Sequence, residues 1–108
     1  MEVWAVIGAN YGDEGKGELT NFLSHSDSIV IRINGGSQAA HTVIHDNHRH
    51  VFSNFGSGTL KGAKTHLSKF MLINPIFSIL EYEKLSQFLP VISVDPTCKL
   101  ILPFDIFL

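Results

Sequence analysis

The hydrophobic residues of this chain fall in short runs separated by glycines, and the period changes from one run to the next. Residues 3–7 form an apolar and aromatic run that a glycine ends, which is typical of a strand buried on both faces of a parallel sheet. Apolar residues then recur at helical spacing, which predicts a helix from about Lys16 to Ser24. The β-branched run "SIVIRING", residues 28–35, predicts a second strand and completes a βαβ unit.

The middle of the chain has a different pattern. In "HTVIHDNHRHVFSNFG", which begins at His41, two runs with strand character flank the polar "DNH", which predicts an antiparallel hairpin over residues 41–55. The next segment, "GSGTLKGAKTH" at residues 56–66, contains three glycines and is predicted to be mostly loop.

The last third returns to alternating strand and helix. A strand is expected at residues 70–73, and Asn74 followed by Pro75 supplies a capping residue and a proline at the first helical position. The runs "VISV" and "KLILPF" predict two more strands, and the second stops at Leu108 without a turn or cap, as in a truncated chain. The expected helix ends near Pro90 and turns four apolar residues inward: Ile76, Ile79, Leu80 and Leu85.

These elements predict an α/β fold with a mainly parallel central sheet, a strand–loop–helix unit similar to that of P-loop proteins, and a β-hairpin insertion. With 108 residues, of which 44% are hydrophobic, the chain suits one small domain or part of a larger one. A net charge of -2 provides no basic surface for nucleic acid or for an anionic membrane. The single cysteine, Cys98, cannot close an intramolecular disulfide, and the N-terminus lacks a signal-peptide pattern. We therefore expect a cytoplasmic protein.

The candidate chemistry lies in the glycine-rich turn "GDEGKG", residues 12–17, between the first strand and the first helix. Such a turn directs backbone N–H groups and the positive end of the helix dipole toward one point, where a phosphate can bind. Lys16 adds a positive charge, and the glycines allow phosphoryl oxygens to approach the backbone.

This turn differs from the common P-loop pattern at two positions. Asn10 replaces the first glycine, and Gly17 replaces the Ser or Thr whose hydroxyl binds Mg²⁺. Asp13 is then the candidate magnesium ligand, because carboxylate oxygen suits a hard cation. The same carboxylate could act as a general base if it reaches a substrate proton.

Two motifs together resemble one enzyme family. "GANYGDEGKG" followed by "RINGGSQAAHTV" is similar to the paired loops of adenylosuccinate synthetases, and "SGTLKGA" and "LILPFD" resemble later segments of the same family. The similarity extends over essentially the whole chain, but family members are several times longer. This chain therefore resembles their N-terminal portion.

The resemblance implies a GTP-dependent ligase that joins IMP to L-aspartate through 6-phosphoryl-IMP, a step of AMP biosynthesis, and a homodimer when intact. It implies that Asp13 removes the N1 proton of IMP and binds Mg²⁺, and that His41 supports charge on the transferred phosphoryl group. Lys16 would contact the phosphates. The family pattern assigns nucleotide contacts to Gly12, Glu14, Gly15, Lys16, Gly17, Gln38 and Thr42, and metal contacts to Asp13 and the backbone carbonyl of Ala40.

Two departures from the family pattern concern the substrate. Gln38 replaces the asparagine that helps to bind the purine nucleotide, and Ala40 replaces a glycine. Related viral ligases use dGMP in place of IMP and resemble this family with a serine at the position of Asp13. Asp13 favours IMP, whereas Gln38 leaves dGMP as an alternative.

Other polar residues are expected to be structural. His45, His48 and His50 are predicted to be solvated on the hairpin, in preference to a transition-metal site. Arg32 could face the nucleotide or pair with a nearby carboxylate, and it is left outside the catalytic set. Lys61 and Lys64 could contact a phosphate or lie in a plain solvated loop, and the plain loop is favoured.

Two other functions remain as alternatives. One is a non-catalytic nucleotide-binding fragment, because these residues include no guanine-binding N-K-x-D element and no aspartate-binding loop. The other is a generic P-loop kinase, which the missing hydroxyl at Gly17 disfavours.

Overall fold

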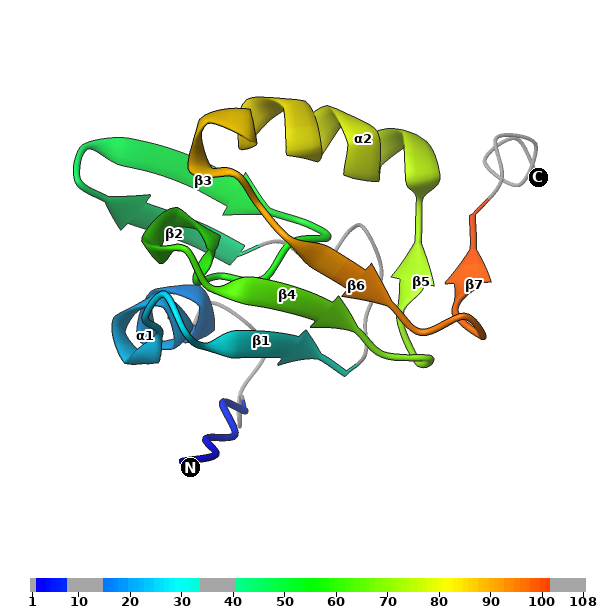
Figure 1. Cartoon of the computed structure of the whole chain (residues 1–108), viewed down its shortest axis with the longest axis horizontal. Coiled ribbons are helices and arrows are strands. Elements are labelled where there is room, and N and C mark those ends of the chain that lie inside the picture. The colour runs from blue at the N-terminus through cyan, green and yellow to red at the C-terminus, as the bar shows by residue number, and fades with distance from the viewer. Residues whose placement is uncertain (1, 8–14, 34–40, 102–108) are drawn as a thin grey trace.

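The computed structural model describes residues 2–7, 15–33 and 41–101, and Figure 1 shows how their elements are arranged. They form an α/β unit, as predicted. In chain order the elements are α1 (Lys16–Leu23), β1 (Ile29–Arg32), β2 (His41–His45), β3 (His48–Phe52), the 3₁₀ turn η1 (Thr59–Lys61), β4 (Lys64–Leu67), β5 (Leu72–Ile73), α2 (Pro75–Lys84), the 3₁₀ turn η2 (Ser86–Phe88), β6 (Ile92–Val94) and β7 (Lys99–Leu100).

The parallel sheet has the strand order β1-β4-β6, so β4 is its central strand (Figure 1). The prediction that residues 56–66 are mostly loop is therefore wrong at their C-terminal end. Thr65 and Leu67 of β4 are buried, whereas Lys64 is exposed and His66 is half-buried. Three of the four residues of this strand are polar, so it lacks the apolar run by which strands are recognised in a sequence. It is identified only by its pairing with a strand on each side.

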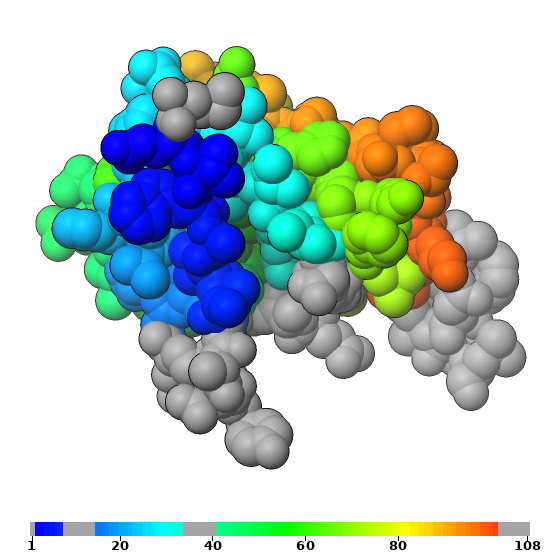
Figure 2. Space-filling model, turned by 90° about the horizontal axis from the view of Figure 1, so that it is seen from below, coloured from blue at the N-terminus to red at the C-terminus, as the bar shows by residue number. Residues whose placement is uncertain are grey.

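The predicted first strand is also absent from the described structure, because residues 2–7 pair with no other described strand. Val3 is 86% exposed and Ile7 84%, and the N-terminal segment, in dark blue, lies on the face of the molecule that Figure 2 shows. An apolar run forms a strand only where a neighbour accepts its ladder of hydrogen bonds. The described parallel pairing therefore starts at β1.

The hairpin of β2 and β3 is confirmed, with His45 paired to His48 at its end. The two residues of the turn, Asp46 and Asn47, have φ angles of 48° and 67°. These left-handed conformations match a type I′ turn, whose twist suits two-residue hairpins and which favours Asn and Asp. A separate parallel pair joins β5 to β7, so the strand predicted at residues 70–73 is shorter than expected.

Helix α2 begins as its sequence predicts. The Oδ1 atom of Asn74 accepts hydrogen bonds from the backbone N–H groups of Ile76, at 3.1 Å, and Phe77, at 3.2 Å, and Pro75 occupies the first helical position. Because this cap satisfies two backbone donors that have no partner within the helix, it fixes where the helix begins.

The inward face of α2 is not the one predicted. Leu85 is buried, but Ile76, Ile79 and Leu80 are between 49% and 60% exposed, and Glu81 is the buried residue of the helix. The helix ends at Lys84, earlier than predicted. The face of α2 that packs against the hairpin is therefore the one that carries the buried carboxylate of Glu81.

Two small cores hold these elements together. The first contains Val43 and Phe52 of the hairpin and extends to residues after it, and the second contains residues of β4 and β5. No helix in the described residues is long and apolar enough to cross a membrane. The members of the first cluster are Val43, Phe52, Phe55, Leu60 and Leu85, and those of the second are Leu67, Met71 and Ile73.

Candidate functional site

The N-terminus of α1 forms one side of the candidate site. Gly15 precedes the helix with a φ of 78°, a left-handed conformation that glycine adopts without steric cost, and its carbonyl accepts the first helical hydrogen bond from Leu19 at 3.0 Å. The chain thus turns sharply into the helix at Lys16, where the positive end of the helix dipole favours an anion.

The hairpin forms the other side, and Gly17 is the point of contact. A Cβ atom built on Gly17 would lie 2.8 Å from the Cβ of His41 and 3.4 Å from the hydroxyl of Ser57. Carbon atoms that are not bonded do not approach so closely, so only glycine allows α1 to pack at this distance from β2. The close contact between helix and hairpin therefore requires glycine at position 17, a requirement that the sequence did not indicate.

A second contact fixes α1 along the hairpin. The Oε1 atom of Glu18 accepts a hydrogen bond from the backbone N–H of Ile44 at 2.9 Å. Together with the contact at Gly17, it connects the first turn of the helix to both ends of β2. Thr42, the residue after His41, is exposed.

The surroundings of His41 favour the neutral imidazole. Burial lowers the pKa of His41 below its ordinary value of 6.5, and the positive charges of Arg32 and Lys16 lower the pKa further. Lys16 and Arg32 therefore both act electrostatically on His41, although the three residues come from separate elements. A neutral imidazole offers one N–H donor and one nitrogen acceptor near pH 7.

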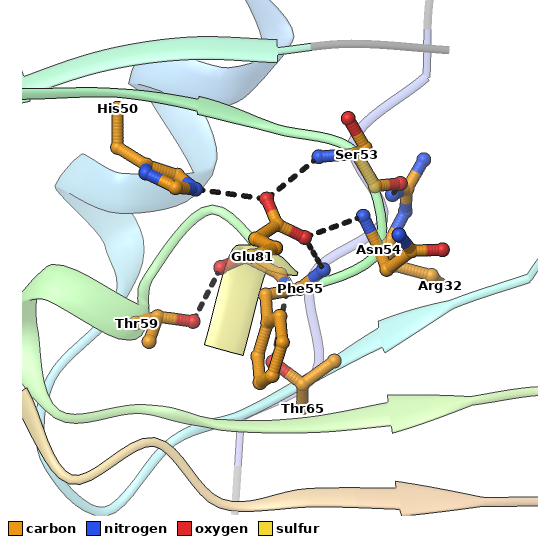
Figure 3. A network of polar contacts seen from close by, with 9 residues as sticks. Arg32, His50, Ser53, Asn54, Phe55, Thr59, Thr65 and Glu81 are labelled. Carbon is orange, nitrogen blue, oxygen red and sulfur yellow. Dashed lines mark hydrogen bonds and ion pairs between the residues drawn. The ribbon is translucent and has the colours of Figure 1, made fainter. Parts of the chain in front are cut away.

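Behind the hairpin lies a buried network centred on Glu81 (Figure 3). The Oε2 atom of Glu81 accepts from the backbone N–H of Ser53 at 2.9 Å and lies 2.8 Å from the Nε2 of His50. Its Oε1 atom accepts from the backbone N–H groups of Asn54 at 2.8 Å and Phe55 at 2.9 Å. The turn at residues 53–55 thus wraps around one carboxylate.

The chemistry of this network follows from its hydrogen bonds. Burial alone raises the pKa of the Glu81 carboxyl, but the bonds from His50 and from three backbone N–H groups outweigh burial and hold the pKa below its ordinary value of 4.5. The prediction that His50 is solvated is wrong, because its side chain is only 11% exposed and pairs with Glu81.

Arg32 joins the same network from the end of β1. It is buried, and its Nη1 donates to the backbone carbonyl of Ser53. Burial lowers the pKa of Arg32, and the charge of Glu81 raises it in part. Arg32 therefore donates a hydrogen bond to a backbone carbonyl and is attracted by the charge of the Glu81 carboxylate. Sequence reasoning missed Glu81, although its spacing of four residues from Leu85 could have indicated one shared buried face.

One further expectation has a structural outcome. Lys61 is not in a plain solvated loop, since its Nζ donates to the backbone carbonyls of Asn21 at 3.0 Å and Phe22 at 3.3 Å and so closes the C-terminal end of α1. Within the described ranges, no group of three or more His, Cys, Asp or Glu side chains could hold a metal ion. Five predicted site residues lie outside the described residues: Gly12, Asp13, Glu14, Gln38 and Ala40.

The fold and this geometry define an α/β unit in which a helix N-terminus faces a hairpin. Residues 5–108 match the family model of adenylosuccinate synthetase, and the chain belongs to that family. The resemblance in the sequence is thus confirmed.

Individual relatives support this assignment. The chain is similar to the adenylosuccinate synthetase of Borrelia turicatae, with 38% identity over 98% of this chain and 25% of that protein. The match to that of Thermoplasma volcanium has 44% identity over 72% of this chain and 18% of that protein. The structure of fully ligated adenylosuccinate synthetase from Plasmodium falciparum superposes with a TM-score of 0.77 and 27% identity, over 87% of this chain and 23% of that one. The chain thus spans about a quarter of the length of the relatives it matches most fully.

Proposed function

We propose that the protein containing this chain is a GTP-dependent ligase that condenses IMP with L-aspartate through 6-phosphoryl-IMP, in the cytoplasmic synthesis of AMP. The observation that carries the proposal is the close contact between Gly17 and the Cβ of His41, which supports a site that combines His41 with the first turn of α1. The family assignment agrees with this chemistry. Because the chain covers about a quarter of its relatives, aspartate binding and guanine recognition belong to other parts of an intact protein.

In-line phosphoryl transfer depends on positioning and on compensation of negative charge. In this proposal Lys16 provides a positive charge at the phosphates, and Gly12, Gly15 and Gly17 provide backbone donors. His41, kept neutral by its surroundings, donates a hydrogen bond from its ring N–H to the transferred phosphoryl group. Asp13 accepts the N1 proton of IMP, so that the purine O6 becomes the nucleophile.

A magnesium ion fits the donor chemistry proposed for this site. Asp13 offers carboxylate oxygen and Ala40 a backbone carbonyl oxygen, and Mg²⁺ prefers oxygen ligands of both kinds. When bound, the ion would neutralise charge on the phosphates. Glu14, Gln38 and Thr42 are the proposed further nucleotide contacts. Gln38 leaves dGMP as the alternative substrate, since its longer amide changes which purine edge it meets.

A second candidate function is binding without turnover by the 108-residue chain. It is favoured by the many apolar side chains on the surface of the described residues, among them Ile31, Phe77 and Ile79, which are each about half exposed or more. We expect the remaining parts of an intact, homodimeric ligase to cover such residues.

Calorimetric titration with Mg²⁺·GTP tests whether the site binds nucleotide at all, as both candidate functions require. We expect saturable binding by the 108-residue chain, weakened in Lys16→Met, and no GTP hydrolysis. A full-length protein carrying this segment should consume GTP only with IMP and aspartate present and should release a succinylated purine nucleotide. GTP consumption without that product would refute the ligase, and faster turnover with dGMP would select the alternative substrate.

A further inference from the structure

The residues at the carboxyl end of β1 form a polar cluster that the proposed reaction does not yet use. Arg32 is the last residue of β1 and reaches the hairpin at Ser53, whose carbonyl it binds. Ser53 follows Phe52, and Phe52 is paired with His41 across the hairpin. The guanidinium therefore binds the chain immediately beside the strand position of His41.

A second polar side chain lies next to this point. Asn54 is completely buried, yet neither its Oδ1 nor its Nδ2 has a hydrogen-bond partner among the described residues. A buried amide without partners costs free energy, so it is retained mainly where a ligand or another group satisfies it. Figure 3 shows Arg32 and Asn54 on the side of the Glu81 carboxylate opposite His50.

Glu81 holds the backbone segment that carries Asn54 and that Arg32 binds. Its carboxylate binds the backbone N–H groups of Ser53 and Asn54, and Ser53 in turn binds Arg32. The attraction between Glu81 and Arg32 compensates part of the cost of burying the guanidinium. One buried carboxylate thus fixes the backbone at Ser53 and Asn54, and the Arg32 guanidinium binds that same backbone.

We propose that Arg32 and Asn54 form a further polar contact for the nucleotide bound at the N-terminus of α1, and that Glu81 is the residue that positions them. Arg32 contacts phosphate oxygen, because a guanidinium can hold a carbonyl and an anion at the same time through different N–H groups. The Asn54 amide supplies a neutral hydrogen bond to the same ligand. This inference rests on the proposed function and extends it by residues outside the glycine-rich turn.

The test is calorimetric titration of Mg²⁺·GTP at several salt concentrations. Losing one charge-assisted contact should weaken binding about tenfold in Arg32→Met and should make the affinity less dependent on salt. Arg32→Lys should recover only part of the affinity, since an ammonium lacks the planar set of donors. Arg49→Met is the matched control, because Arg49 is an exposed arginine of the hairpin, and it should bind within twofold of the unmodified chain.

Asn54→Leu tests the amide without a large change of volume. The melting temperature of the free variant should be unchanged or higher, because a buried amide without partners is removed, whereas binding of Mg²⁺·GTP should weaken several-fold. A fall in melting temperature with unchanged affinity would mean that the amide is structural and would overturn its assignment.

Glu81→Gln tests positioning. If Glu81 acts through Arg32, this change should weaken binding in the unmodified chain but by less than twofold in the Arg32→Met background, since the contact it supports is already lost. If Glu81→Gln weakens binding by the same factor in the Arg32→Met background as in the unmodified chain, Glu81 does not act through Arg32. Glu83→Gln removes an exposed carboxylate of the same helix and should have no effect.

One measurement needs no substitution. In the unmodified chain, the NMR signals of the Arg32 Nε–H and of the Asn54 side-chain amide should move as Mg²⁺·GTP saturates the protein. If Mg²⁺·GTP binds but these signals stay fixed, the inference is wrong and the proposed function stands. If the unmodified chain does not bind Mg²⁺·GTP, both are wrong for this chain.

Discussion

Gly17→Ala tests whether the contact between α1 and the hairpin forms the site. The added Cβ would lie 2.8 Å from the Cβ of His41, and ordinary contact begins near 3.4 Å. The helix and β2 must therefore move apart by at least about 0.6 Å. Neither atom is at the end of a flexible side chain, so the shift involves the backbone.

Two opposing effects set the magnitude. Overpacking a tight contact typically costs about 1 to 3 kcal/mol, whereas replacing a helical glycine by alanine returns at most about 1 kcal/mol. The midpoints of these two ranges give a net loss of about 1.5 kcal/mol in the free energy of unfolding of Gly17→Ala. For a domain of this size, that change lowers the melting temperature by roughly 6 to 12 °C.

Urea unfolding followed by circular dichroism measures this loss, and a double-mutant cycle identifies its cause. His41→Gly removes the atom that the new methyl group meets, so Gly17→Ala should cost at least about 1 kcal/mol less in that background than in the unmodified chain. If the two effects add within about 0.5 kcal/mol, steric contact between these positions is not the cause and the account of Gly17 is refuted.

Three further predictions concern the framework around the site. Glu81 has a lowered pKa in the folded chain, so its carboxylate stabilises the fold above pH 4.5, and this stability is lost as the pH falls through the folded pKa. Glu81→Gln should therefore flatten the acidic part of a plot of unfolding free energy against pH. An unchanged plot would contradict the stabilising role of Glu81. Asn74→Ala removes the cap of α2 and should cost about 0.5 to 2 kcal/mol in urea unfolding, whereas no loss would mean that the cap is redundant. Lys61→Met should cost about 0.5 to 1 kcal/mol, because Lys61 closes the end of α1, and the exposed Lys64→Met is its control; equal losses would argue against the cap.

The elements that sequence reasoning predicted correctly are those fixed by local chemistry. Asn74 and Pro75 determine the start of α2 through a cap that uses only neighbouring N–H groups. The hairpin follows from alternating residues around Asp46 and Asn47, which tolerate the backbone of its turn. The helix at Lys16 also forms where it was predicted, although its apolar Leu19 and Phe22 are exposed and its buried residues are Gly17 and Asn21.

The elements that it missed depend on contacts between distant segments. The carboxylate of Glu81 binds residues 26 to 28 positions away, and those bonds, not the apolar spacing of Ile76 and Ile79, decide which face of α2 is buried. Strand β4 has a polar sequence and is a strand because β1 and β6 pair with it. For the site, the glycines indicated phosphate chemistry, but the contact of Gly17 with His41 requires the packed structure.

The most direct test of the central claim is a crystal structure of the protein with Mg²⁺ and a non-hydrolysable GTP analogue. The account predicts phosphate oxygens within hydrogen-bond distance of the backbone N–H groups at Gly15 to Gly17 and of a ring nitrogen of His41. Phosphates bound elsewhere, or a His41 ring turned away from the first turn of α1, would contradict it.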